Sequence, residues 1–152
     1  WTKVLDVNLH GHLRVLRAAT PYLKIGIEPA VVVIASKNVL APGPGAAAYS
    51  AAKAGLTQLS RVAALELGEH GVRVNVLHPN AVFDTALWTD EVLASRAKQY
   101  GLSVEDYRRG NILGVEVESR HVAALAVAFA GPLFSRTTGA QVPIDGGNER
   151  VI

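Results

Sequence analysis

Cysteine and methionine are both absent from the 152 residues. Without cysteine the chain can form neither a disulfide framework nor a thiolate metal site, and this composition suits a reducing compartment. We therefore expect a cytoplasmic protein. We expect no metal site from histidine either, because His10 and His12 are two residues apart and would face different sides of a helix. Since the chain begins at Trp1 rather than at a methionine, we expect that residue to be a cut end.

Charge of one sign and long apolar runs are also scarce. The formal net charge is only +2 and like charges do not cluster, so binding to nucleic acid or to an acidic membrane surface is not expected. No apolar run is long enough to cross a bilayer, and the first residues do not resemble a signal peptide. In contrast, 49% of the residues are hydrophobic, which is typical of a chain with a well-buried α/β core.

Apolar periodicity predicts one helix and one strand in the first part of the chain. Over residues 1–24 apolar side chains recur with a period near 3.6, which predicts an amphipathic helix with a kink or a last-turn break at Pro21. Residues 30–35 form a continuous, mostly β-branched run between turn residues. That pattern is typical of a strand that is buried on both faces in a parallel sheet.

The following segments continue this alternation. An alanine- and leucine-rich helix is predicted over residues 46–69, ended by Gly71, and a second strand over 72–78, ended by Pro79. A strand, a long helix and another strand form one crossover unit, so the two strands should be parallel, with a right-handed connection. Small side chains on this helix should let another helix approach closely: Ala47, Ala51 and Gly55.

A long polar excursion follows the second strand. Residues 80–118 carry more charge and more aromatic side chains than the rest, with short helical patterns at 85–99 and 103–111. A segment of this length beyond a strand end is typical of a lid or a substrate loop.

The chain then returns to the sheet. Ser119 is the expected N-cap of a helix through Ala130, and a short final strand is predicted at 141–144. Together, the alternating strands and helices predict an α/β fold in one domain.

Tyr49 and Lys53 are the most informative pair in the chain. They are four residues apart in the helix predicted over 46–69, which puts both side chains on one face, one turn apart. The ammonium favours the phenolate form of the tyrosine, which could then act as a general acid or base on an alcohol or a carbonyl. Alone, such a pair is more often part of a solvated surface, so the surrounding residues must decide between a surface pair and a proton-transfer pair.

Two polar residues in the preceding segments favour the chemical interpretation. Ser36 directly follows the first predicted strand, and ligands of open α/β sheets bind beyond the carboxyl ends of strands. Asn8 interrupts the apolar part of the first helix, where an asparagine competes for backbone hydrogen bonds. Each also has a purely structural interpretation: Ser36 could only start the next turn, and Asn8 could be a satisfied core amide.

The order and spacing of these four residues resemble the C-terminal half of a short-chain dehydrogenase/reductase. That family has an Asn-Ser-Tyr-Lys tetrad with the same separation of serine and tyrosine, here 13 residues (49 − 36 = 13). Its proline after the next strand is matched by His78-Pro79. Its terminal T-G-x-x-x-x-V-D-G-G is matched by Thr138-Gly139 through Ile144-Asp145-Gly146-Gly147. The resemblance implies that residues 1–152 are the C-terminal portion of a Rossmann-type, doubly wound parallel sheet with three α/β/α layers.

The resemblance also implies a role for each site residue. Tyr49 would exchange a proton with the substrate oxygen, Ser36 would hydrogen-bond that oxygen, and Lys53 would bind the nicotinamide ribose. Asn8 would hold a water that passes the proton to bulk solvent. The cofactor would be NAD or NADP, contacted by Tyr49, Lys53, Pro79, Asn80, Val82 and Thr85. The substrate would be an alcohol or a carbonyl compound, contacted by Ser36, Asn38, Ala81 and Trp88.

The chain departs from the family pattern at several places. Asn80 replaces the usual glycine after the proline, and the turn is preserved if asparagine adopts the positive φ there. Thr85 stands one place later than the family's threonine, which puts its diphosphate contact in doubt. The family's first half carries the Gly-rich turn that holds the pyrophosphate, and that half has no counterpart here. We therefore expect the N-terminal half to be missing and the fragment to be inactive without it.

A narrower resemblance comes from the excursion. Its opening, Pro79-Asn80-Ala81-Val82-Phe83 with Leu87-Trp88, and the later Arg96-Ala97-Lys98-Gln99-Tyr100-Gly101 resemble the dehydrogenase region of bifunctional rhamnulose-phosphate aldolase/short-chain dehydrogenases. This implies a fused polypeptide in carbohydrate metabolism and a small hydroxyaldehyde, such as lactaldehyde, as substrate.

Two other functions stay open. The chain could be a non-catalytic dinucleotide-binding protein, or a dimerisation module that forms a homo-oligomer through residues 1–24 and 46–69, a contact that the family resemblance also implies. The intact tetrad favours the enzyme, because a scaffold needs no such spacing. The choice between NAD and NADP depends on residues of the missing half.

Overall fold

A sheet of three parallel strands organises the computed structural model, which describes residues 1–148. The strands are β1 (Ala30–Ile34), β2 (Arg73–Pro79) and β3 (Gln141–Ile144), and their spatial order is β1-β2-β3. Ala30 of β1 lies opposite Arg73 of β2, and Val76 of β2 lies opposite Gln141 of β3. The parallel pairing predicted for the first two strands is confirmed. Residues 149–152 of the predicted domain lie outside the described residues.

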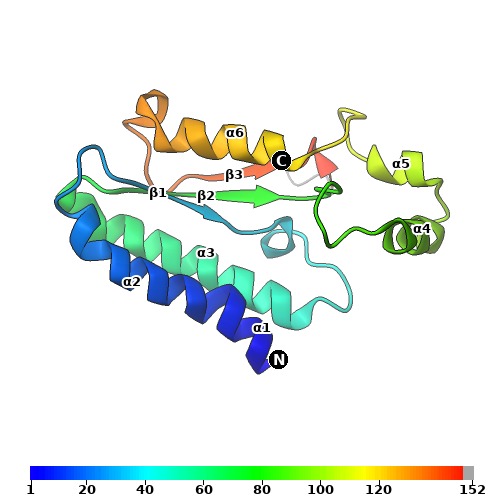
Figure 1. Ribbon diagram of the computed structural model, residues 1–152, viewed down its shortest axis with the longest axis horizontal. Coiled ribbons are helices and arrows are strands. Elements are labelled where there is room, and N and C mark those ends of the chain that lie inside the picture. The colour runs from blue at the N-terminus through cyan, green and yellow to red at the C-terminus, as the bar shows by residue number, and fades with distance from the viewer. Residues whose placement is uncertain (149–152) are drawn as a thin grey trace.

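Helices cover both faces of this sheet (Figure 1). The first helical segment and α3 (Ala47–Leu67) lie on one face, and α6 (Ser119–Ala130) packs across β1 and β2 on the other. Two short helices, α4 (Asp90–Gln99) and α5 (Val104–Arg108), lie beyond the carboxyl end of β2. No helix among residues 1–148 is both long and apolar enough to span a bilayer. The layered arrangement is the α/β fold that the sequence predicts.

The helix predicted over residues 1–24 is continuous but changes its winding. α1 (Thr2–Leu5) passes into a π-helical turn, η1 (Asp6–His10), and then into α2 (Gly11–Leu23). In the wide turn the N–H of Gly11 bonds to the carbonyl of Asp6, five residues earlier. Pro21 lies inside the last turn of α2, which tolerates the proline and ends two residues later.

The next helix and strand differ from their predictions only at their ends. α3 is followed by a 3-10 turn, η3 (Gly68–His70), and Gly71 then adopts φ of 72°, a left-handed conformation that glycine reaches without steric cost. β2 begins one residue later than predicted and includes Pro79, which pairs with Ile144.

The burial predicted for β1 is wrong. The sequence predicts a strand buried on both faces, whereas its residues are half-buried and Ile34 is 41% exposed. The reason is its place in the sheet, because β2 covers one edge of β1 and no described strand pairs with the other. β2 is the central strand, and its residues from Arg73 to His78 are all buried.

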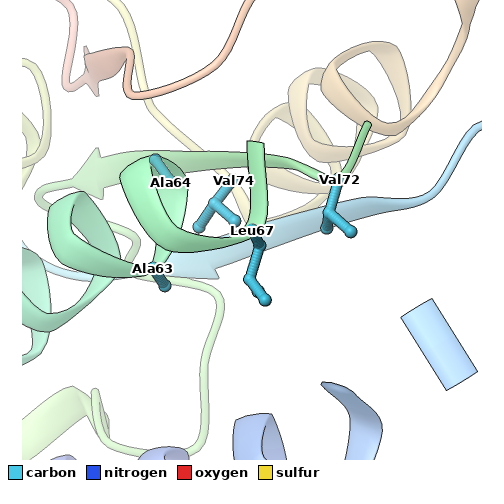
Figure 2. Close-up of a cluster of buried hydrophobic side chains, with 5 residues drawn as sticks. All are labelled: Ala63, Ala64, Leu67, Val72 and Val74. Atoms are coloured by element: carbon cyan, nitrogen blue, oxygen red, sulfur yellow. The ribbon is translucent and has the colours of Figure 1, made fainter. Parts of the chain in front are cut away.

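The core lies between α3 and β2, where Figure 2 shows five side chains grouped together: Ala63, Ala64, Leu67, Val72 and Val74. The alanines allow α3 to lie close to the strand. Gly55 does the same for η1, since a Cβ there would lie 3.2 Å from the side chain of Leu9. The predicted close helix approach is thus confirmed at Gly55, while Ala47 and Ala51 are exposed.

The helices of the excursion are shorter than predicted. α4 begins at Asp90 rather than near residue 85, because Thr89 is its N-cap and accepts a hydrogen bond from the N–H of Val92. Ser103 caps α5 in the same way. The N-cap prediction for α6 is wrong by one residue, since Glu118 caps that helix and forms a capping box with His121.

Ser119 instead closes the base of the excursion. Its N–H and its hydroxyl both donate to the carboxylate of Asp84, the hydroxyl at 2.6 Å. The bond from the hydroxyl, followed by that from the N–H, lowers the pKa of Asp84 below its ordinary value. Val82 also forms a parallel bridge with Val117. The two ends of the excursion are therefore joined to each other.

Candidate active site

The predicted tetrad residues converge on the N-terminal half of α3. This helix packs against η1, which carries Asn8, and against the 3-10 turn η2 (Lys37–Val39), which directly follows Ser36. Tyr49 and Lys53 lie in the first two turns of α3 itself. The elements that carry or directly follow the other two residues thus both contact the helix of Tyr49 and Lys53.

Lys53 and Tyr49 lie side by side, as their spacing predicts. The Nζ atom of Lys53 is 5.8 Å from the centroid of the Tyr49 ring and donates a hydrogen bond to the carbonyl of Ile34 at 3.0 Å. Lys53 is only 7% exposed, and this burial lowers the pKa of its ammonium. An ammonium has three donors and the Ile34 carbonyl takes one, so the group can also bind the hydroxyls of a ligand.

Ser36 is held at the carboxyl end of β1. Its Oγ accepts a hydrogen bond from the N–H of Asn38 at 3.2 Å, and a hydroxyl that accepts in this way keeps its own proton to donate. Its carbonyl oxygen lies 2.9 Å from Nδ1 of His78. Asn38, a predicted substrate contact, uses its Oδ1 to accept from the N–H of Gly43 at 3.2 Å, and so shapes the following loop. Ser36 also starts the 3-10 turn η2, as its purely structural interpretation predicts.

Asn8 lies in the π-helical turn and is half-buried. Its Nδ2 donates to the carbonyl of Val4 at 3.1 Å, so one donor is satisfied within the helix. The side-chain oxygen of an asparagine is a separate acceptor that could hold a water. π-helical turns occur frequently at functional sites, and here the turn coincides with the predicted site residue.

The loop after β2 contains a strained residue. Ala81 has φ of 54°, a left-handed conformation that costs about 1 kcal/mol for a residue with a Cβ. Asn80, which stands where the family usually has glycine, does not take a positive φ; it continues the line of the strand and donates its N–H to the carbonyl of Ile144 at 3.3 Å. The positive φ of this loop lies at Ala81 instead.

The remaining predicted residues lie on the excursion. The hydroxyl of Thr85 donates to the carbonyl of Val82 at 3.2 Å, so it is engaged within the loop, and its contact with a diphosphate stays a prediction. Trp88 packs edge-on against Phe83 with ring centroids 4.9 Å apart, and Phe83 also contacts Tyr107. Trp88 is therefore held within an aromatic cluster of this segment.

Two histidines that the sequence argument did not assign to the site lie close to it. His12 lines an apolar groove of about 600 Å³ between α2, α3 and β1. Its Nδ1 is buried without a hydrogen-bond partner among the described residues. Burial, and then the charge of Lys53, lower the pKa of His12. Its position four residues after Asn8 is the signal that could have found it. His78 lies beside Ser36. In the sequence its only distinguishing feature is its position directly before Pro79.

Comparison with known proteins identifies the family. The family described as enoyl-(acyl carrier protein) reductase matches residues 1–149. The chain belongs to the short-chain dehydrogenase/reductase family. Membership was expected from the tetrad spacing, and this expectation is confirmed.

Relatives in this family support the same fold. D-beta-hydroxybutyrate dehydrogenase of Rhizobium meliloti is 30% identical over 152 residues, which cover 97% of this chain and 58% of that protein. The uncharacterized oxidoreductase YuxG of Bacillus subtilis is 34% identical over 153 residues, 97% of this chain but 22% of that protein. The NADPH-bound short chain oxidoreductase of Pseudomonas aeruginosa PAO1 has a TM-score of 0.85 at 27% identity, covering 100% of this chain and 58% of that chain. This chain therefore spans less than two thirds of each.

The residues present fit the nicotinamide end of a dinucleotide. The buried ammonium of Lys53, the phenol of Tyr49 and the hydroxyl of Ser36 are donors suited to ribose hydroxyls and to a substrate oxygen. They lie at the carboxyl end of β1, where open α/β sheets bind their ligands. The chemistry of this donor set therefore agrees with the cofactor that the family resemblance implies.

Proposed function

We propose that this chain is the catalytic half of an NAD(P)-dependent oxidoreductase that interconverts an alcohol and a carbonyl compound. The observation that carries the proposal is the ammonium of Lys53 held beside the ring of Tyr49, on the helix that packs against the turn after Ser36. Because the chain covers only part of the length of its relatives, the activity is proposed for a longer polypeptide, called the parent here. The parent also contains the Gly-rich cofactor-binding half.

Each group of the site has one task in this proposal. A bound nicotinamide supplies or accepts the electrons. Tyr49 gives a proton to the carbonyl oxygen of the substrate, or takes it from the alcohol. Lys53 stabilises the phenolate by its charge and binds ribose hydroxyls with its remaining donors. Ser36 donates its hydroxyl proton to the same substrate oxygen. Asn8 holds a water that passes the proton towards solvent.

The loop after β2 completes the proposed site. The backbone of Val82 binds the carboxamide of the cofactor, with further cofactor contacts from Pro79, Asn80 and Thr85. Ala81 and Trp88 contact the substrate, as do Ser36 and Asn38. The position of this loop at the carboxyl edge of the sheet supports these assignments.

Replacing Tyr49 by phenylalanine in the parent tests the function. We expect kcat to fall at least about 100-fold while cofactor affinity changes less than about threefold, because only the proton-transferring hydroxyl is lost. Initial-rate assays of cofactor reduction measure kcat, and a fluorescence titration with the cofactor measures its affinity. Tyr22→Phe is the matched control, since Tyr22 is exposed on α2. A Tyr49→Phe rate within about threefold of wild type would contradict the proposal.

The substrate and the wider polypeptide are finer parts of the proposal. We infer a small hydroxyaldehyde such as lactaldehyde and a cytoplasmic parent fused to a rhamnulose-phosphate aldolase, in carbohydrate metabolism. The resemblance of the excursion supports this, and so does YuxG, in which the matched segment is only 22% of the protein. A relative named D-beta-hydroxybutyrate dehydrogenase supports a small hydroxylated substrate. The intact mass and the N-terminal sequence of the parent test the fusion.

A non-catalytic dimerisation or dinucleotide-binding protein on the same fold is the second candidate. Exposed apolar side chains on α2 and α3 favour a homo-oligomer contact there: Val15, Val62 and Leu65. A parent that binds NAD or NADP but transfers no hydride to any small carbonyl compound would favour this second function over the enzyme.

A further inference from the structure

A line of hydrogen-bonded polar groups, centred on His78 of β2, joins the three strands. Ser36 follows β1, His78 lies in β2 and Gln141 opens β3. Nδ1 of His78 is 2.9 Å from the carbonyl oxygen of Ser36, and its Nε2 is 3.3 Å from the side-chain oxygen of Gln141. His78 is 0% exposed, so its bond to Ser36 is shielded from water. A bond shielded in this way is stronger than one at the surface.

The chemistry of the partners decides where the proton of His78 lies. A carbonyl oxygen only accepts hydrogen bonds, so the bond to Ser36 requires a proton on Nδ1. In the neutral ring Nε2 is then an acceptor, and Gln141 satisfies it by turning its amide nitrogen towards the ring. The oxygen and nitrogen of an amide are assigned from such a network, so this orientation is compatible with the heavy-atom positions.

We propose that His78 is a positioning residue for the hydroxyl of Ser36. Ser36 has an extended backbone, with φ of −168°, and stands between the last residue of β1 and η2. His78 holds its carbonyl from one side, and the N–H of Asn38 holds its Oγ from the other. With both groups fixed, the hydroxyl proton is directed to one place. The catalytic part of this inference rests on the proposed function, in which Ser36 donates to the substrate oxygen.

Replacing His78 by asparagine or by glutamine can keep one of its two hydrogen bonds while removing the other. In asparagine the Nδ2 atom lies near the position of the histidine Nδ1, so His78→Asn can keep the bond to Ser36 while losing that to Gln141. In glutamine the Nε2 atom lies near the position of the histidine Nε2, so His78→Gln keeps the bond to Gln141 and loses that to Ser36. Both substitutions put an uncharged amide into the same buried site. They are therefore matched controls for each other.

The expected result in the parent is a difference in kcat. With NAD(H) or NADP(H) and a small carbonyl substrate, kcat of His78→Gln should be at least about tenfold below that of His78→Asn, while their KM values agree within about threefold. A merely structural role would change both variants alike. Equal kcat values in the presence of an active wild type overturn the positioning role. An inactive wild type contradicts the proposed function instead, so the two failures are distinguishable.

A second measurement decides the inference even if both variants fail to fold. In the wild-type polypeptide labelled with 15N-histidine, the ring nitrogen signals report which atom carries the proton. We expect Nδ1 of His78 to be protonated, with a proton that exchanges slowly with solvent because the ring is buried. An unprotonated Nδ1 overturns the inference, since the carbonyl of Ser36 would then have no donor in the ring.

Discussion

At the scale of single residues, the site depends on an ammonium that is kept away from water. Burial lowers the pKa of Lys53, whose hydrogen bond goes to the neutral carbonyl of Ile34. The same charge acts on His12, whose pKa is lowered first by burial and then by Lys53. The charge of Lys53 therefore disfavours protonation of His12, and a change at Lys53 should be measurable at His12.

Replacing Lys53 by methionine should raise the pKa of His12 towards its ordinary value, because the charge is removed while the burial remains. An NMR titration of the imidazole in wild type and variant measures the shift. Lys24→Met is the control, since Lys24 is exposed at the C-terminal end of α2. A shift of equal size in both variants would show that the charge of Lys53 does not act specifically on His12.

The lowered pKa of His12 also gives stability a pH dependence of known sign. The unfolded chain binds this proton at a higher pH than the folded one, so protonation favours unfolding. The contribution is fully present above the unfolded pKa of about 6.5 and is lost as the pH falls towards the lower, folded value. Denaturant unfolding of the parent at several pH values, with His12→Leu beside wild type, measures it. The variant should lose less stability than wild type over this window, and a greater loss would contradict the assignment.

At the scale of elements, the glycine pair at the end of β3 is where the excursion returns to the sheet. Gly146 has φ of 68°, and a Cβ there would lie 2.5 Å from Oδ1 of Asn111. Its carbonyl accepts a hydrogen bond from the N–H of Leu113 at 3.0 Å, and Nδ2 of Asn148 donates to the carbonyl of Gly110 at 2.9 Å. The Asp-Gly-Gly sequence thus forms the surface on which the second half of the excursion packs.

Gly146→Ala should destabilise the parent by about 2–4 kcal/mol, because it combines backbone strain with crowding against Asn111. Gly139→Ala is the matched control. Gly139 has φ of 74° but would place its Cβ in open space, so only the strain of about 1 kcal/mol remains. Denaturant unfolding compares the two variants. Equal losses would show that the contact with Asn111 contributes nothing.

The elements that could be predicted are those whose signals are local. α3 and the Tyr49–Lys53 pair follow from helical spacing, and the pair lies as predicted because residues four apart on a helix are neighbours. The strain at Ala81 could not be predicted, since local sequence gives an alanine no preference for a positive φ and the preceding residue is tied to Ile144 by a long-range bond.

The contact between Ser36 and His78 escaped the sequence for the same reason. The two residues are 42 apart in the chain, and only the pairing of β1 with β2 brings them together. The half-burial of β1 is likewise a property of its place at the sheet edge rather than of its β-branched residues. Features that depend on a pattern within one helix or strand can therefore be predicted from the sequence. Contacts between distant elements become known only from the folded structure.

At the scale of the whole molecule, one edge of β1 has no partner strand among the described residues. One edge of Ala30–Ile34 pairs with β2, and the other edge presents backbone N–H and C=O groups on a β-branched strand. The apolar groove of about 600 Å³ between α2, α3 and β1 adds unpaired surface. A free edge of this kind favours strand addition and aggregation.

We therefore predict that the 152-residue chain, made alone, is not a stable monomer and binds NAD or NADP only weakly. It should dimerise, aggregate, or require the N-terminal half supplied in trans. Sedimentation, calorimetry and a cofactor titration measure these properties, and the same chain mixed with the cofactor-binding half is the control. A monomer that melts cooperatively and binds the cofactor with micromolar affinity would show that nothing essential is missing.

The hydrogen bonds between Ser119 and Asp84 hold the two ends of the excursion together, so that the segment between them can be replaced by another. Because its base is closed there and at the Val82–Val117 bridge, a change of length in the part that does not pack against the end of β3 leaves these two attachment points in place. Doubling the length of a closed flexible loop costs only about 0.6 kcal/mol. Segments of different length and composition could thus be grafted between these two residues while the tetrad elements stay in place. In the proposed enzyme, such an exchange would replace Trp88 and its aromatic neighbours while Tyr49 and Lys53 stay unchanged.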